Sequence, residues 1–80
     1  MFYIYVLKSQ KDYGFYIGQT NNLENRLYRH NAGQVRSTKS RIPLELVHSE
    51  QFKTRAEAMR REKYLKSLKG GEAFKKIVNI

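Results

Sequence analysis

Apolar and aromatic residues gather in two short runs near the N-terminus, residues 3–7 and residues 15–18, with a polar stretch between them. Both runs are rich in the aromatic and β-branched side chains that fit a pleated sheet, so each predicts a strand. The polar residues 8–14 end in Gly14, which favours a return turn. The pattern therefore predicts a β-hairpin at the start of the chain.

Because side chains alternate between the two faces of a strand, four residues of this hairpin form two pairs, each on one face. Tyr3 and Tyr5 share one face of the first strand. Tyr16 and Gly18 share one face of the second. If pairing places these faces on the same side, phenol hydroxyls converge beside a glycine that leaves room for a ligand.

A helix is predicted to follow, from Leu23 towards Gly33. Asn21 and Glu24 have the spacing of a capping box, with Asn21 as the cap. Gly33 is suited to the position just past a helix end.

One face of this helix combines apolar and polar side chains. At about 100° per residue, that face carries Leu23, Arg26, Leu27 and His30. From the residues alone, Arg26 could extend its head group from the edge of the core to water, and His30 could be an ordinary histidine at that edge. The alternative is that both side chains face a functional site.

Residues 34–42 are predicted to form a loop, and a third strand is predicted from Leu44 to Phe52. The loop contains cations separated by hydroxyl residues, namely Arg36, Lys39 and Arg41. Such a loop can follow a phosphate backbone, or it can be a solvated connector. Both interpretations remain open.

A second helix is predicted after the capping box that Thr54 and Glu57 form, and Gly70–Gly71 would end it. The tail is predicted to be a short amphipathic helix that buries Phe74, Ile77 and Val78.

Glu62 lies on the apolar face of the second helix, beside Ala58 and Leu65. A carboxylate in such a place needs a partner, which could be an arginine, a hydroxyl or a metal ion. An ordinary pair with Lys66, one turn later, is the alternative.

The elements follow one another as strand, strand, helix, strand, helix, helix. The first strand is apolar on both faces, which favours a central position with helices packed on the sheet. We therefore expect an α+β fold in a single domain of residues 1–80: a three-stranded mixed β-sheet with a central first strand, flanked by helices.

Composition adds a charge signal. Lysine and arginine exceed aspartate and glutamate by nine, so nucleic acid is the expected partner and a membrane surface is not. The chain has no cysteine, which excludes disulfides and thiolate zinc sites and fits a reducing cytoplasm. The apolar run after Met1 is too short for a signal peptide or a transmembrane helix.

The hairpin resembles the GIY-YIG nuclease family. The first family tripeptide corresponds to Tyr3-Ile4-Tyr5, with tyrosine in place of glycine, and the second is present unaltered as Tyr16-Ile17-Gly18. The resemblance extends from Phe2 to about Val78, and it implies the same α+β architecture.

The resemblance also implies an activity, the metal-dependent hydrolysis of a phosphodiester in nucleic acid. DNA is expected as the substrate rather than RNA. It assigns catalytic roles to Tyr5, Tyr16, Arg26, His30 and Glu62. Glu62 would hold one Mg²⁺ or Mn²⁺, Arg26 would stabilise charge on phosphorus, and Tyr5 or Tyr16 would activate water. Specificity would come from substrate shape or from a partner protein.

Besides Tyr3, two positions bear on how well the chain follows the family pattern. Gln19 stands where some members have a lysine, and Asn79 is the only asparagine near the C-terminus that could match one used by some members. A nucleic-acid-binding module without turnover, and a basic interaction protein, therefore stay open as alternatives.

Overall fold

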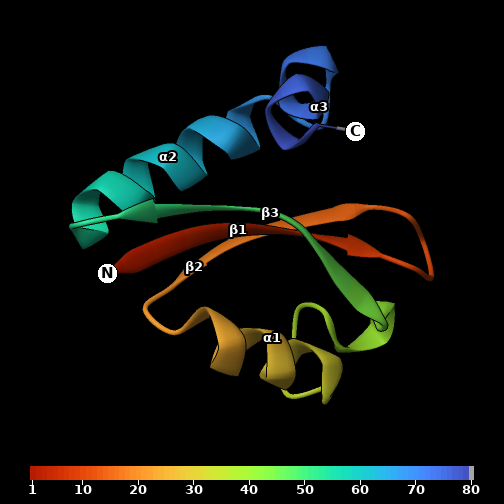
Figure 1. Cartoon of the computed structure of the whole chain (residues 1–80). Coiled ribbons are helices and arrows are strands. Elements are labelled where there is room, and N and C mark those ends of the chain that lie inside the picture. The colour runs from red at the N-terminus through yellow and green to blue at the C-terminus, as the bar shows by residue number, and fades with distance from the viewer. Residues whose placement is uncertain (80) are drawn as a thin grey trace.

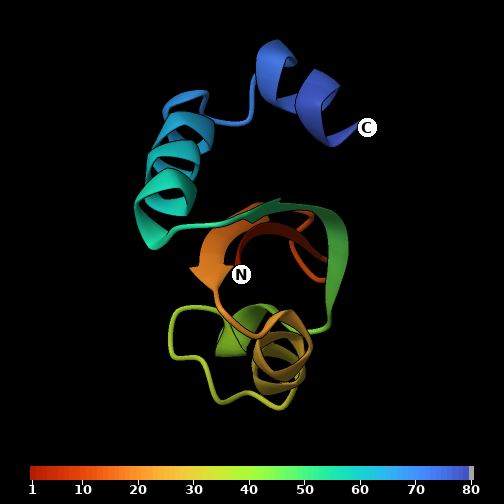
Figure 2. The ribbon, with the colours of Figure 1, turned by 60° about the vertical axis from the view of Figure 1, so that its left-hand side comes forward.

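The computed structural model describes residues 1–79, which form one β-sheet covered by helices on both faces (Figure 1). The strands are β1 (Phe2–Ser9), β2 (Phe15–Thr20) and β3 (Leu44–Phe52). The helices are α1 (Leu23–Asn31), α2 (Arg55–Ser67) and α3 (Glu72–Val78), and a short 3₁₀ helix, η1, spans Lys39–Arg41. Helix α1 lies on one face of the sheet, and α2 and α3 lie on the other (Figures 1 and 2).

The strand order is β2-β1-β3, which confirms the central position predicted for the first strand. Both β2 and β3 pair with β1 in the antiparallel sense, so the sheet is antiparallel and the prediction of a mixed sheet was wrong. The two strands joined by α1 are parallel to each other, but they lie on opposite edges of β1. The crossover therefore creates no parallel pair.

Alternate residues of β1 enter two separate cores, as a strand buried on both faces requires. Ile4 and Val6 pack with residues of α2 and α3, whereas Tyr5 and Leu7 lie in the core on the α1 side. Phe74 and Val78 of α3 are buried as predicted, and Ile77 is half-buried.

The helix ends follow local side-chain chemistry. The side chain of Asn22 caps α1 by accepting a hydrogen bond from the Asn25 N–H, so the predicted Asn21 cap was wrong by one residue. Thr54 and Glu57 form the predicted capping box of α2. That helix ends at Ser67, and Gly70 follows with a φ of +73°.

Side-chain hydrogen bonds attach the segment between α1 and β3 to the rest of the fold. The amide of Asn31 donates to the Leu44 carbonyl and accepts from the Leu44 N–H. The Ser9 hydroxyl donates to the carbonyl of Arg41 at 2.6 Å. These contacts fix both the end of α1 and the start of β3 relative to β1.

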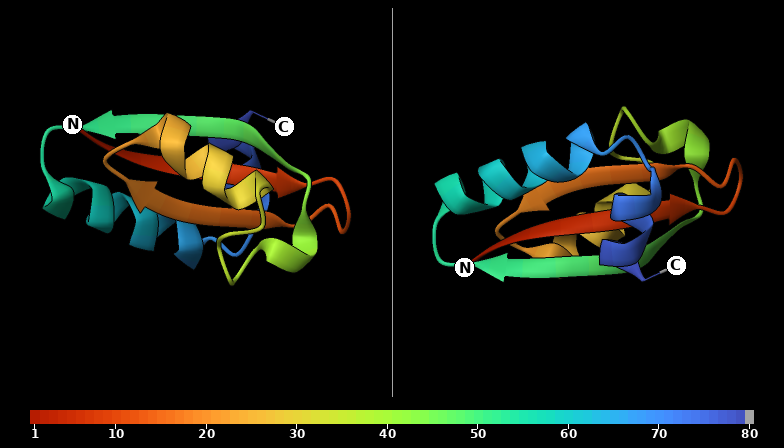
Figure 3. Two further views of the ribbon diagram at one scale, coloured as in Figure 1. Left: turned by 90° about the horizontal axis from the view of Figure 1, so that it is seen from below. Right: turned by 90° about the horizontal axis from the view of Figure 1, so that it is seen from above.

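Helix α2 runs alongside β2, the strand at one edge of the sheet, as the views from below and above show (Figure 3). Side chains of α2 can therefore reach the edge of β2. Within residues 1–79, no helix combines the length and the apolar character needed to cross a bilayer.

Candidate active site

Tyr5 lies in the centre of β1, and its side chain is 1 % exposed. Its hydroxyl is 2.9 Å from Nε2 of His30, which α1 brings to the same face of the sheet. Burial, reinforced by the neighbouring Tyr16, raises the pKa of Tyr5 well above its usual range, and the charge of Glu62 acts in the same direction. The positive charge of Arg26 opposes this change in pKa. Tyr5 is therefore a neutral phenol at pH 7.

His30 is fully buried and is hydrogen-bonded through both ring nitrogens. Nδ1 lies 2.7 Å from the hydroxyl of Thr38, which is also fully buried. Burial, together with the charges of Arg26 and Arg29, lowers the pKa of His30 to about 4. The imidazole is therefore neutral at pH 7, and one of its nitrogens carries a free lone pair.

Tyr16 completes an aromatic cluster with these residues. Its ring centroid is 5.1 Å from that of His30 and 6.3 Å from that of Tyr5. Tyr16 is half-buried, so it is the member of the cluster with access to solvent. This geometry confirms, for Tyr5 and Tyr16, the predicted convergence of phenols on one face.

Gly18 pairs directly with Tyr5 across the hairpin. A Cβ atom at this position would lie 2.5 Å from the Tyr5 oxygen and 2.7 Å from the ring carbon that bears it. The space beside the glycine, which the sequence suggested for a ligand, is thus filled by the phenol of Tyr5. Only glycine permits this close approach.

Arg26 lies on α1 one turn before His30 and is half-buried. Its charge acts on both side chains of the buried hydrogen bond, because it lowers the pKa of His30 and acts to lower that of Tyr5. The positive charge of Arg26 therefore acts on the aromatic cluster, as expected from the shared helix face.

Glu62 approaches from the other face of the sheet. Its carboxylate lines a shallow pocket at the edge of β2, together with Gln19, Met59, Lys63 and Lys66. Its side chain is 17 % exposed, and one carboxylate oxygen lies 2.8 Å from Nζ of Lys66. The ion pair with Lys66 that the sequence left open is therefore formed.

Oxygen donors at this edge suit a hard divalent cation. Among residues 1–79, no group of three or more histidine, cysteine, aspartate or glutamate side chains comes together. Mg²⁺ needs only one or two protein oxygens. Glu62 supplies one carboxylate, and Oε1 of Gln19, in the same pocket, is a buried oxygen that has no hydrogen-bond partner in the described chain.

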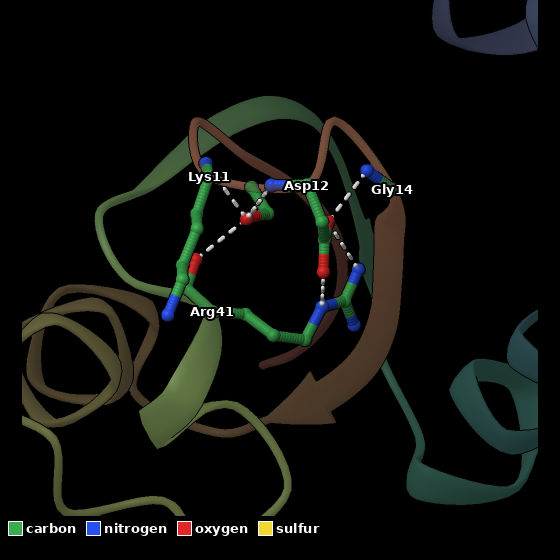
Figure 4. A network of polar contacts seen from close by, with 5 residues as sticks. Lys11, Asp12, Gly14 and Arg41 are labelled. Atoms are coloured by element: carbon green, nitrogen blue, oxygen red, sulfur yellow. Dashed lines mark hydrogen bonds and ion pairs between the residues drawn. The ribbon is translucent and has the colours of Figure 1, made fainter.

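The three loop cations have different surroundings. Arg36 and Lys39 are exposed. The Arg41 side chain instead reaches the hairpin loop, where its Nε lies 2.8 Å from the carboxylate of Asp12 (Figure 4). Arg41, and the Gly14 N–H, hold the pKa of Asp12 below its usual range. Arg36 and Lys39 are the loop cations open to a ligand.

Thr38 is the site residue that the sequence did not indicate. It lies eight residues after His30, in a loop without periodicity, and its hydroxyl resembles those of its neighbours Ser37 and Ser40 in sequence. Its contact with His30 depends on the path of the loop that follows α1, which no local pattern encodes.

Comparison with known proteins supplies the family. The model of the GIY-YIG catalytic domain matches residues 1–76. A UPF0213 protein of Staphylococcus haemolyticus is 42% identical over 94% of this chain and 92% of its own length. A UPF0213 protein of Natronomonas pharaonis is 46% identical, over 82% of this chain and 78% of its own length.

The UPF0213 protein YazA of Bacillus subtilis is 45% identical, over 82% of this chain and 67% of its own length. No solved structure matches the chain. The family model covers both tripeptides, α1 and the glutamate of α2, so the resemblance seen in the sequence is confirmed. The chain belongs to the GIY-YIG family and consists almost entirely of its catalytic domain.

Proposed function

We propose that the protein is a divalent-metal-dependent endonuclease that hydrolyses phosphodiester bonds in nucleic acid, DNA in preference to RNA. The observation that carries the proposal is the buried hydrogen bond between Tyr5 and neutral His30, beside Tyr16 and the charge of Arg26. A phenol and an imidazole buried together are arranged for proton transfer.

Tyr5 would activate water as a relay, because its raised pKa leaves no phenolate at pH 7. Tyr16, the phenol with access to solvent, would hold the attacking water beside Tyr5. As the water oxygen attacks phosphorus, one water proton would pass to the Tyr5 oxygen, and the phenolic proton to Nε2 of His30. The bond from phosphorus to the leaving oxygen breaks, and that oxygen takes a proton from solvent. Imidazolium formed at His30 then returns its proton to the Tyr5 oxygen while the proton that Tyr5 took from water passes to solvent, which restores the starting state.

Arg26 would stabilise the additional negative charge that develops on the phosphoryl oxygens. Its planar guanidinium can donate two parallel hydrogen bonds to a phosphate, which a lysine cannot do. Arg26 also makes His30 a weaker base in the free protein. A bound phosphodiester would neutralise that charge and so make proton transfer to His30 easier.

Glu62 would hold Mg²⁺ or Mn²⁺, with the Gln19 oxygen beside it. When bound, the metal ion supplies positive charge at the leaving oxygen. Lys66 would release the carboxylate for this purpose, and its side chain, 57 % exposed, has room to turn towards solvent.

Arg36 and Lys39 would contact the phosphate backbone, which suits the charge of +9. Specificity would depend on substrate shape or on a partner protein. The absence of cysteine is consistent with action in the cytoplasm.

The test is a cleavage assay on duplex, nicked, branched and single-stranded DNA and on RNA, with Mg²⁺, Mn²⁺ or neither. Glu62→Gln should stay folded, bind DNA at least as well and lose cleavage, because the amide lacks the charge that a hard cation requires. Glu45→Gln removes an exposed carboxylate from β3 and is the matched control, which should cleave normally.

Salt-sensitive binding with no cleavage of any substrate would instead favour a binding module. The Glu62–Lys66 ion pair is the observation that supports this second candidate, since a purely structural glutamate would form the same contact. In that case Glu62→Gln should lower the melting temperature equally with and without Mg²⁺.

A further inference from the structure

Thr38 ends a chain of hydrogen bonds that begins at Tyr5 and passes through both nitrogens of His30. The Thr38 hydroxyl is 2.7 Å from Nδ1 of His30, and it also makes a long contact of 3.5 Å with the carbonyl of Val35. Tyr5, His30 and Thr38 are each at most 1 % exposed, so solvent does not compete for these groups.

A neutral imidazole has one N–H, and the two possible tautomers give different chains. With the proton on Nε2, His30 donates to the Tyr5 oxygen and accepts from Thr38. Within residues 1–79, His30 is the one hydrogen-bond partner of the Tyr5 hydroxyl, so the buried phenolic O–H would then have no acceptor. Leaving a buried donor unsatisfied is unfavourable, so this tautomer is the disfavoured one.

With the proton on Nδ1, every donor has an acceptor. The Tyr5 O–H donates to Nε2, the Nδ1–H donates to the Thr38 oxygen, and the Thr38 O–H donates towards the Val35 carbonyl. The lone pair of Nε2 then faces the phenol, and the phenol oxygen keeps its own lone pairs for another donor.

We propose that Thr38 is a positioning residue that fixes the proton of His30 on Nδ1 and thereby keeps Nε2 free to accept the proton of Tyr5. The catalytic meaning of this tautomer rests on the proposed function, whereas the tautomer itself does not. Thr38 touches neither water nor phosphate in the proposed reaction and acts only through His30.

The backbone around Thr38 holds its hydroxyl in place. The Thr38 N–H donates to the Val35 carbonyl at 3.1 Å, and the Arg41 N–H donates to the Thr38 carbonyl at 2.8 Å. The hydrogen bond from Ser9 to the Arg41 carbonyl then attaches this turn to β1, the strand that also carries Tyr5. Strand β1 therefore carries Tyr5, the proton donor of the proposed relay. Through Ser9 it also holds the turn whose Thr38 bonds to His30, the proton acceptor.

The experiment compares Thr38→Val, which keeps the shape and removes the hydroxyl, with Thr38→Ser, which restores it. The tautomer of His30 is read at pH 7 from the ¹⁵N shifts of both ring nitrogens. His48, which pairs with Glu50 beneath α2, serves as the internal reference and should be unchanged. Cleavage kinetics and melting temperatures are measured on the same proteins.

We expect the Nδ1–H tautomer in the wild type and in Thr38→Ser, and a shift towards the Nε2–H tautomer in Thr38→Val. The kcat of Thr38→Val should fall, with KM unchanged. The loss should lie between about 10-fold, as for an outer partner of a metal-ligating histidine, and about 10⁴-fold, as for a Ser-His-Asp triad left in the wrong tautomer.

An unchanged tautomer in folded Thr38→Val would overturn the proposal. So would an equal loss of kcat in Thr38→Ser and Thr38→Val, because the hydroxyl would then have no specific role. If the tautomer responds as expected but the wild type cleaves no substrate, the positioning by Thr38 stands and the proposed nuclease function fails.

Discussion

The contact between Gly18 and Tyr5 makes Gly18→Ala a sharp test of the site. The added methyl carbon would lie 2.5 Å from the phenol oxygen and 2.7 Å from the adjacent ring carbon of Tyr5. Non-bonded carbon atoms normally stay about 3.5–4.0 Å apart, so the overlap is about 1 Å. The ring of Tyr16, 3.1 Å from the same position, closes another side.

Tyr5 cannot relieve the overlap by turning to solvent, because it is buried between β1 and α1 and is hydrogen-bonded to His30. Either the phenol moves by about 1 Å or the strands separate. Overpacking of this kind costs about 1–3 kcal/mol. In a domain of this size, each kcal/mol lowers the melting temperature by about 4–8 °C.

The effect on catalysis should exceed the effect on stability. A misplacement of about 1 Å can cost about 10²-fold in rate, and here it falls on the hydrogen bond between Tyr5 and His30. We therefore expect Gly18→Ala to cleave about 10²-fold more slowly at a temperature where it is fully folded, while its affinity for DNA is unchanged.

Single-turnover cleavage, DNA binding and thermal melting should be measured together. Gly71→Ala is the matched control, because a Cβ atom there meets only the Leu68 carbonyl at 3.4 Å, at the start of α3. This variant should keep the wild-type rate. Cleavage at the wild-type rate by folded Gly18→Ala would refute the reasoning, since Tyr5 would then tolerate displacement.

Three further predictions concern charge. Arg26→Lys should lower turnover by about 10²-fold or more in single-turnover assays and leave binding unchanged, and wild-type cleavage would make Arg26 a structural residue. Because burial, Arg26 and Arg29 lower the pKa of His30 from 6.5 to about 4, the unfolded chain binds the extra proton first. Stability should therefore fall as the pH drops below 6.5 towards 4, and His30→Gln should remove this component from melting curves. Changing Arg36 and Lys39 together to glutamate should weaken DNA binding for all sequences alike and reduce the slope of log affinity against log salt by about 2, so an unchanged slope would contradict phosphate contact.

The elements were predictable because their signals are local. Alternation in residues 3–7 indicated which side chains of β1 share a face, and the Thr54–Glu57 capping box indicated the start of α2. Strand direction has no such signal, which is why the mixed sheet was wrong. The choice between Asn21 and Asn22 as the cap of α1 depended on backbone geometry, since either side chain can accept the hydrogen bond.

The site was predictable to a different extent. Periodicity placed Arg26 and His30 on one helix face. The family resemblance was needed to decide that these side chains face a functional site and are not ordinary residues at the edge of the core. Neither approach indicated Thr38, whose hydroxyl reaches His30 only through the fold of a loop. Nor did either approach indicate that Asp12, in the hairpin loop, would pair with Arg41.

The candidate site spans both faces of the sheet, which explains why no single element reveals it. Gly18 and Gln19 are neighbours in β2, so Gly18 faces Tyr5 on the α1 side while Gln19 faces Glu62 on the α2 side. Burial is the main cause of the raised pKa of Tyr5, and the charge of Glu62, on the other side of the sheet, adds to it. Strand β2 lies at the edge of the sheet. In the proposed reaction, a phosphodiester that contacts both Tyr5 and Glu62 must therefore lie against the edge of β2, where Gly18 has no side chain.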